Sequence, residues 1–104
     1  MPRVDPEEYV ELVLRCVEQV PRGRVTTYGA VAEVVGALVG GGGPRQVGSV
    51  MASYGGPVSW WRVVRADGRI VTAKASRQAA LLRAEGVVVS DGRVVAAPVG
   101  RFAG

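Results

Sequence analysis

The stretch that decides the fold reads Pro44-Arg45-Gln46-Val47-Gly48-Ser49-Val50-Met51-Ala52-Ser53-Tyr54, then Gly55-Gly56-Pro57-Val58, then Ser59-Trp60-Trp61-Arg62-Val63-Val64. Pro44 suits the first turn of a helix, where its missing N–H is no loss. Helical spacing predicts one buried face, made of Val47, Val50, Met51 and Tyr54. The opposite face holds small residues led by an arginine: Arg45, Gly48, Ser49 and Ala52. Small side chains allow this helix to lie close to another surface.

The second half of this stretch, Ser59 to Val64, is an apolar run that contains both tryptophans of the chain. We expect it to be a strand of the core. Because neighbouring residues on a strand point to opposite faces, Trp60 and Trp61 should diverge.

Two more helices are predicted upstream of this stretch. Asp5 and Pro6 form a good helix start, and apolar residues then recur at helical spacing to Val20. Thr27 is placed to cap a second helix over residues 28–38, and residues 40–43 form a flexible glycine connector. A short helix that leads into the helix from Pro44 suggests a variant of the helix-turn-helix motif.

Downstream, turn signals predict two hairpins separated by a helix. Apolar residues flank Asp67-Gly68 between Val63 and Val71, which indicates a hairpin that would form a wing. Ser76 should cap a helix that runs to Glu85 and stops at Gly86. A second hairpin surrounds Asp91-Gly92. The prediction is one mainly α domain with small β hairpins, a winged helix-turn-helix-like fold, with a core over about residues 5–95 and a flexible tail over 96–104.

Composition narrows the function. The 104 residues include no histidine and one cysteine, Cys16, so neither a disulfide within the chain nor a cysteine-based zinc site is expected. Cys16 lies on the apolar stripe of the first helix and should be a core residue, with a reactive thiol as the alternative.

No cofactor, metal or catalytic residue is predicted, and no run of about 18 apolar residues suggests a membrane span. We expect a monomer in the cytoplasm, associated with the nucleoid if the source is bacterial. The net charge of +4 suits an anionic partner.

Several motifs resemble the C-terminal DNA-binding domain of alkylguanine-DNA alkyltransferases. Arg45-Gln46-Val47-Gly48 is similar to the Arg-Ala-Val-Gly helix of that family, and Ser59-Trp60-Trp61-Arg62 is similar to its active-site segment. The alkyltransferase-like proteins match better, since they carry Pro-Trp-His-Arg in that segment, with tryptophan at the place of the reactive cysteine. Ser59 and Trp61 depart from this pattern, because proline and histidine are expected there. Thr27-Tyr28-Gly29 and Ala84-Glu85-Gly86 are further matches.

The resemblance implies roles for individual residues. Arg45 would enter the base stack in place of an extruded nucleotide, and Tyr28 would steer that nucleotide; core packing is the alternative for Tyr28. The implied DNA-binding residues are Tyr28, Arg45, Gln46, Gly48, Ser49 and Ala52. The implied lesion pocket consists of Tyr28, Trp60, Arg62 and Val63, although Arg62 could also brace the fold through hydrogen bonds. Glu85 matches the acid of the transferase relay, but with neither histidine nor cysteine to relay to, its expected role is to support the structure of the helix end.

The leading hypothesis is therefore a sensor without enzymatic activity. It would bind double-stranded DNA that contains O6-alkylguanine through a helix in the minor groove, flip the base, and mark the lesion for nucleotide excision repair proteins. The alternative is a regulatory or architectural winged-helix module without lesion recognition. The extra indole of Trp61 could fill the pocket, which keeps this alternative open.

Overall fold

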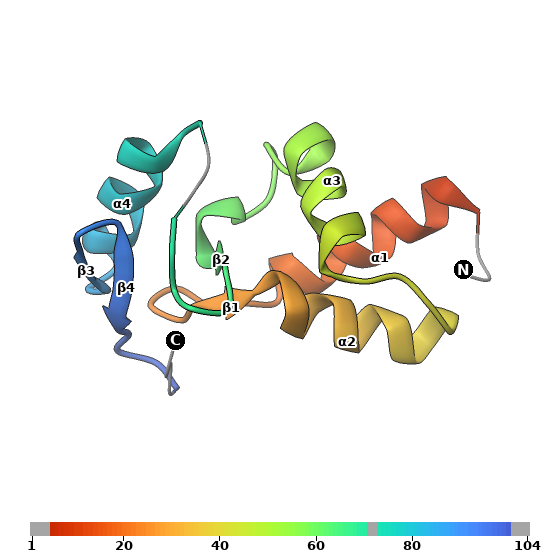
Figure 1. Cartoon of the computed structure of the whole chain (residues 1–104), viewed down its shortest axis with the longest axis horizontal. Coiled ribbons are helices and arrows are strands. Elements are labelled where there is room, and N and C mark those ends of the chain that lie inside the picture. The colour runs from red at the N-terminus through yellow and green to blue at the C-terminus, as the bar shows by residue number, and fades with distance from the viewer. Residues whose placement is uncertain (1–4, 71–72, 101–104) are drawn as a thin grey trace.

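The computed structural model of the chain describes residues 5–70 and 73–100. The helices are α1 (Pro6–Glu18), α2 (Tyr28–Val39), α3 (Pro44–Tyr54) and α4 (Ala75–Ala84), with a 3-10 turn, η1, at Trp60–Arg62. The strands are β1 (Thr26–Thr27), β2 (Val63–Val64), β3 (Val88–Ser90) and β4 (Arg93–Ala96). Figure 1 shows α1, α2 and α3 at one end of the molecule and α4 with β3 and β4 at the other. The predicted class, mainly helical with small β elements, is confirmed.

Local capping explains where the first two helices begin. The Asp5 carboxylate accepts a hydrogen bond from the Glu8 N–H at 2.9 Å, and the Thr27 hydroxyl accepts one from the Ala30 N–H at 3.0 Å. Both predicted caps are confirmed. The predicted cap at Ser76 is wrong, because α4 already begins at Ala75 and Ser76 lies inside the helix.

The glycine connector between α2 and α3 has a defined conformation. Gly40 ends α2 in the left-handed region with φ 78°, and Gly42 has φ 92°. A Cβ atom on Gly42 would lie 2.6 Å from the hydroxyl oxygen of Tyr9 on α1. Glycine is therefore needed at position 42 both for the backbone angle and for the close approach to α1.

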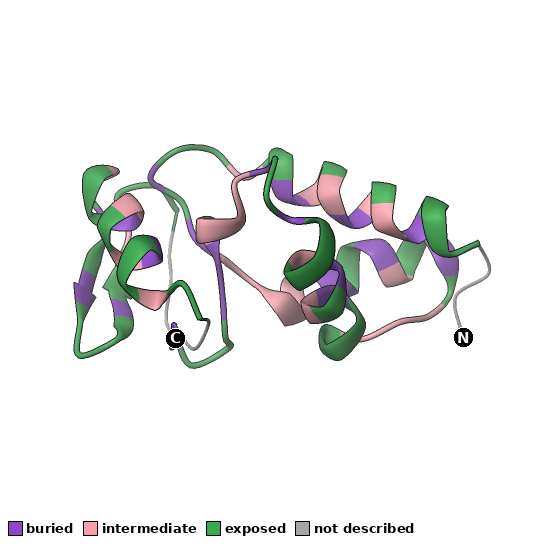
Figure 2. Cartoon of the chain, turned by 90° about the horizontal axis from the view of Figure 1, so that it is seen from above, coloured by how far each residue is buried: buried purple, intermediate pink, exposed green. Residues whose placement is uncertain are grey.

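Two hydrophobic clusters form the core, and β2 lies between them. The first cluster joins α1, α2 and α3 and includes Val63, whereas the second joins the β3–β4 hairpin to α4 and includes Val64. Strand alternation explains this division, since adjacent residues of a strand face opposite sides. Figure 2 shows the buried residues on the inward sides of the helices and hairpin.

The predicted wing is described only as far as Ile70. A tight turn does form, in which the Gly68 N–H donates to the Arg65 carbonyl at 2.8 Å. However, Val63–Val64 pairs in parallel with Thr26–Thr27, and the backbone of Arg69 forms an isolated antiparallel β-bridge with that of Arg93. The Arg65 N–H also donates to the Arg69 carbonyl at 3.2 Å, so the two predicted arms meet at the turn. The parallel partner Thr26–Thr27 was not predicted, and the predicted pairing of Val63–Val64 with the run that ends at Val71 depends on residue 71, which lies outside the described residues.

The C-terminal hairpin forms as predicted. Asp91 and Gly92 both have positive φ, 52° and 72°, which is the geometry of a tight two-residue hairpin turn. Ala96 ends β4, and the Val99 N–H donates to the Gly23 carbonyl at 3.1 Å. The chain thus lies against the Gly23 loop at residue 99, within the stretch that was predicted to be flexible; residues 101–104 lie outside the described residues. Within the described part of the chain, no helix has both the length and the apolar character that a bilayer crossing requires.

Candidate functional site

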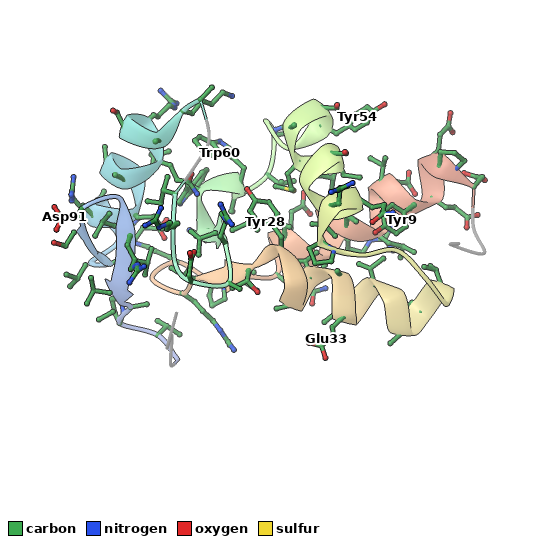
Figure 3. All side chains as sticks on the ribbon, viewed as in Figure 1. Tyr9, Tyr28, Glu33, Tyr54, Trp60 and Asp91 are labelled. Atoms are coloured by element: carbon green, nitrogen blue, oxygen red, sulfur yellow. The ribbon has the colours of Figure 1, made fainter. Side chains whose placement is uncertain are left out.

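A cavity of about 390 Å³ lies between α3 and the start of α4. Its volume is in the range of about 300–1,000 Å³ that small-molecule sites occupy. The described residues that line it come from α2, α3, η1 and the loops around them: Tyr28, Gly48, Met51, Ala52, Gly55, Gly56, Trp60, Ala73 and Lys74. Figure 3 shows Tyr28 and Trp60 in the space between α3 and α4.

The exposed face of α3 forms the rim of this cavity. Gly48 and Ala52 line the cavity and belong to the predicted small-residue face. Arg45, Ser49 and Ala52 are exposed, and a Cβ atom on Gly48 would meet no atom within 4 Å. One face of α3 is therefore both open to a surface that approaches it and continuous with the cavity.

Tyr28 and Trp60 form two aromatic walls. Tyr28 is the first residue of α2, directly after the capping residue Thr27, so the capped helix end fixes its position. The Tyr28 hydroxyl is neutral at physiological pH and can donate a hydrogen bond; burial raises the pKa of this phenol further above its ordinary value. Trp60 begins η1. The structure thus brings together two residues that the sequence analysis assigned to one pocket.

The two tryptophans diverge, but not for the predicted reason. Residues 60–62 form a 3-10 turn and not a strand, so that part of the prediction is wrong. The rings meet edge to face, with centroids 6.0 Å apart and planes at 87°. Trp60 lines the cavity, whereas Trp61 packs against the second hydrophobic cluster. The extra indole therefore lies outside the cavity instead of filling it.

Comparison with known proteins identifies the family. Residues 8–87 match the sequence model of the 6-O-methylguanine DNA methyltransferase DNA-binding domain. The chain belongs to this family. It is 30% identical to the DNA base-flipping protein of Vibrio parahaemolyticus over 89 residues, which cover 82% of this chain and 86% of that protein. It is 38% identical to the DNA base-flipping protein of Escherichia coli, over 81% of this chain and 66% of that protein.

Among solved structures, S. pombe Atl1 in complex with damaged DNA containing O6-carboxymethylguanine superposes with a TM-score of 0.71. The identity is 32%, and the match covers 84% of this chain and 83% of that chain. The expected resemblance to alkyltransferase-like proteins is thereby confirmed, as is a helix-turn-helix fold of the same family.

Glu85, the match to the acid of the family's relay, is the centre of a buried hydrogen-bond network. Its Oε1 accepts from the Gly23 N–H and from Nε of Arg62, both at 3.0 Å. Its Oε2 accepts from Nε1 of Trp61 at 2.9 Å and from Nη2 of Arg62 at 2.6 Å. Burial alone would raise the pKa of Glu85, but the hydrogen bonds from Arg62, Gly23 and Trp61 and the charge of Arg62 outweigh it and lower the pKa to about 2. The predicted role at the helix end was too narrow, since Glu85 joins three segments.

Three of the sequence-assigned residues make contacts within the fold. Arg62 does not line the cavity, because its guanidinium also donates to the Val20 carbonyl at 2.8 Å and to the Ser59 hydroxyl at 3.2 Å. These bonds fit the alternative given for Arg62, that it braces the fold. Val63 is buried in the first cluster and, like Arg62, is not among the described residues that line the cavity. Gln46 is exposed, but its side chain accepts from the Gly43 N–H at 2.8 Å and so caps α3.

One further error concerns exposure. Tyr54, the last residue of α3, was expected on the buried face but is 56% exposed. Cys16 packs beside the first cluster, as expected, and burial raises the pKa of its thiol.

Sequence reasoning missed the wall that closes the cavity from the α4 side. Ala73 and Lys74 belong to this wall, and Nζ of Lys74 lies 5.3 Å from the centroid of the Trp60 ring. The only signal in the sequence was that Lys74 is the single lysine of an arginine-rich chain. Buried Gln78 was missed as well; its amide donates to the Trp61 and Val63 carbonyls at 3.1 and 3.0 Å and supports η1.

Proposed function

We propose that the protein binds double-stranded DNA and recognises O6-alkylguanine by turning the damaged base into the cavity beside Trp60. The observation that carries this proposal is the continuity of two surfaces on α3. Gly48 and Ala52 belong to the small, exposed face of the helix and also line the cavity. A helix that lies in the minor groove with this face toward the DNA has the cavity mouth beside the bases.

Base flipping also requires a group that fills the gap in the stack, and we assign this role to Arg45. Arg45 is the second residue of α3. It is exposed and lies on the same face of the helix as Ser49 and Ala52. An arginine side chain is long enough to enter the duplex, and its planar guanidinium stacks on bases. Tyr28, with a neutral hydroxyl, would contact the flipped nucleotide or its phosphate.

The protein holds the base without removing its alkyl group. An indole at position 60 cannot accept the group as a thiolate does. The single cysteine, Cys16, lies on α1 beside the first cluster, and the chain contains no histidine that could activate it. Incubation with duplex DNA labelled on the alkyl group should leave the protein unlabelled. Label on any residue in stoichiometric amount would contradict this part of the proposal.

A protein that binds a lesion without repairing it needs a second activity to remove the damage. We therefore include in the proposal that the complex marks the lesion for nucleotide excision repair, as the family resemblance implies. The test is incision of an alkylguanine duplex by purified excision-repair proteins, with and without this chain. Equal incision rates would remove this part while leaving lesion binding intact.

The decisive experiment compares two duplexes that differ only in one O6-methylguanine. We expect tighter binding to the damaged duplex, and binding to both should weaken with salt. For a domain that contacts few phosphates, the log–log slope should be about −3 to −5, since each neutralised phosphate contributes about −0.9. Equal affinity for the two duplexes would favour the alternative, a DNA-binding module without lesion recognition.

A further inference from the structure

We propose that the cavity prefers guanine adducts that carry a negative charge, and that Lys74 provides this preference; the inference rests on the lesion binding proposed above. Among the described residues that line the cavity, Lys74 is the one with a charged side chain. Its ammonium nitrogen lies 5.3 Å from the centroid of the Trp60 ring. The positive charge is thus next to the wall on which an adduct would rest.

The start of α4 adds a second positive source at the same wall. Ala73 and Lys74 both line the cavity, and α4 begins directly after them at Ala75. The unpaired N–H groups of a helix start give it a partial positive charge. The described residues that line the cavity include no acidic side chain.

Because the other walls of the cavity are mostly apolar, the positive charge of Lys74 should distinguish anionic adducts from neutral ones. Most of the lining consists of glycine, alanine, methionine and aromatic residues, which contact a neutral alkyl group only by packing. A carboxylate on the adduct can in addition accept a hydrogen bond from the ammonium group, and such charge-assisted bonds are about twice as strong as neutral ones. The cation also offsets the repulsion that a carboxylate meets among the phosphates of the DNA.

The test uses two adducts of nearly the same shape. Duplexes containing O6-carboxymethylguanine, which is anionic, and O6-carbamoylmethylguanine, which is neutral, are titrated with the full chain, alongside the undamaged duplex. We expect roughly tenfold tighter binding to the anionic adduct, the scale of one charge-assisted hydrogen bond over a neutral one.

Three variants assign the effect to the side chain. Lys74→Gln should abolish the preference between the two adducts, and Lys74→Arg, which retains the charge, should keep most of it. Arg77→Gln is the matched control, because Arg77 is an exposed cation in the first turn of α4 that does not line the cavity. It should lower affinity for all duplexes alike. Thermal melting checks that each variant is folded.

The outcomes separate this inference from the proposed function. Equal affinity for the two adducts, with both bound more tightly than undamaged DNA, would overturn charge selection and leave lesion binding in place. A preference that survives Lys74→Gln would overturn the role of Lys74. Equal affinity for all three duplexes would overturn lesion binding, and the present inference with it.

Discussion

Replacing Glu85 by glutamine should remove a pH-dependent part of the stability of the fold. The Glu85 side chain is 4% exposed and that of Arg62 is 12% exposed, so this ion pair is largely shielded from solvent. With the pKa of Glu85 held at about 2, against an ordinary value of about 4.3, the ionised form contributes about 3 kcal/mol to the free energy of unfolding at neutral pH.

The sign of the pH dependence follows from the direction of the shift. Because the folded-state pKa lies below the unfolded value, the full contribution is present above about pH 5 and is lost as the pH falls towards 2. Glutamine cannot ionise, so Glu85→Gln should lack this dependence. It should also cost about 3–5 kcal/mol at pH 7, because it leaves the guanidinium of Arg62 without its counter-charge.

Urea unfolding followed by tryptophan fluorescence at several pH values between 7 and 3 measures both effects. The control is Glu33→Gln, since Glu33 is an exposed carboxylate on α2. It should follow the parent curve at every pH. Parallel loss of stability in the parent and in Glu85→Gln between pH 5 and pH 3 would refute the depressed pKa. A cost at pH 7 near zero would refute the role of the network in holding the three segments together.

Gly48→Ala should have opposite effects on stability and binding. Because a Cβ atom at this position meets nothing within 4 Å, the change should stabilise α3 by up to about 1 kcal/mol. It should weaken DNA binding, because the added methyl group thickens the face of α3 beside the cavity. Melting and titration test the pair, and unchanged affinity would contradict the assigned face. Trp60→Ala should weaken binding to alkylguanine DNA by about 1–3 kcal/mol and leave undamaged DNA nearly unaffected. Trp61→Ala should lower the melting temperature instead. If Trp61→Ala loses lesion affinity and Trp60→Ala loses melting temperature, the roles of the two tryptophans are exchanged. Arg45→Ala should reduce lesion binding without a change in melting temperature, because the residue is exposed; a drop in melting temperature would make Arg45 structural.

Local signals in the sequence were sufficient for most helix boundaries. Asp5, Thr27 and Pro44 each supply a helix start through their own side chain or ring, and each helix begins where these residues predict. Positive φ at Asp91 and Gly92 likewise depends on two adjacent residues only. Such features need no knowledge of the rest of the chain, which is why they could be predicted.

The conformation of residues 60–62 could not be predicted in this way. The apolar run from Ser59 to Val64 is typical of a strand, but the guanidinium of Arg62 bonds to Val20 and to Glu85, which lie 42 and 23 residues away. These distant partners hold the turn. The same limit explains Lys74, since the cavity wall forms only when the start of α4 packs near η1, and no local pattern records that contact.

Glu85 links the stability of the fold to the geometry of the cavity. The resemblance assigns it to the acid of a relay that serves a histidine and a cysteine, and this chain has tryptophans at both of those positions. The Trp61 indole nevertheless donates to Glu85 at 2.9 Å, so the carboxylate retains a partner at that position. Because Trp61 and Arg62 are the second and third residues of η1, their bonds to Glu85 fix the turn that presents Trp60 to the cavity. A carboxylate that could orient a catalytic base in an enzyme can therefore position an aromatic wall in a binding protein.

Glu85→Gln should therefore affect lesion binding as well as stability. At a pH where the variant is folded, it should lose affinity for the damaged duplex and bind undamaged DNA as the parent does. If the ratio of its affinities for the damaged and undamaged duplexes equals that of the parent, Trp60 keeps its place without this network.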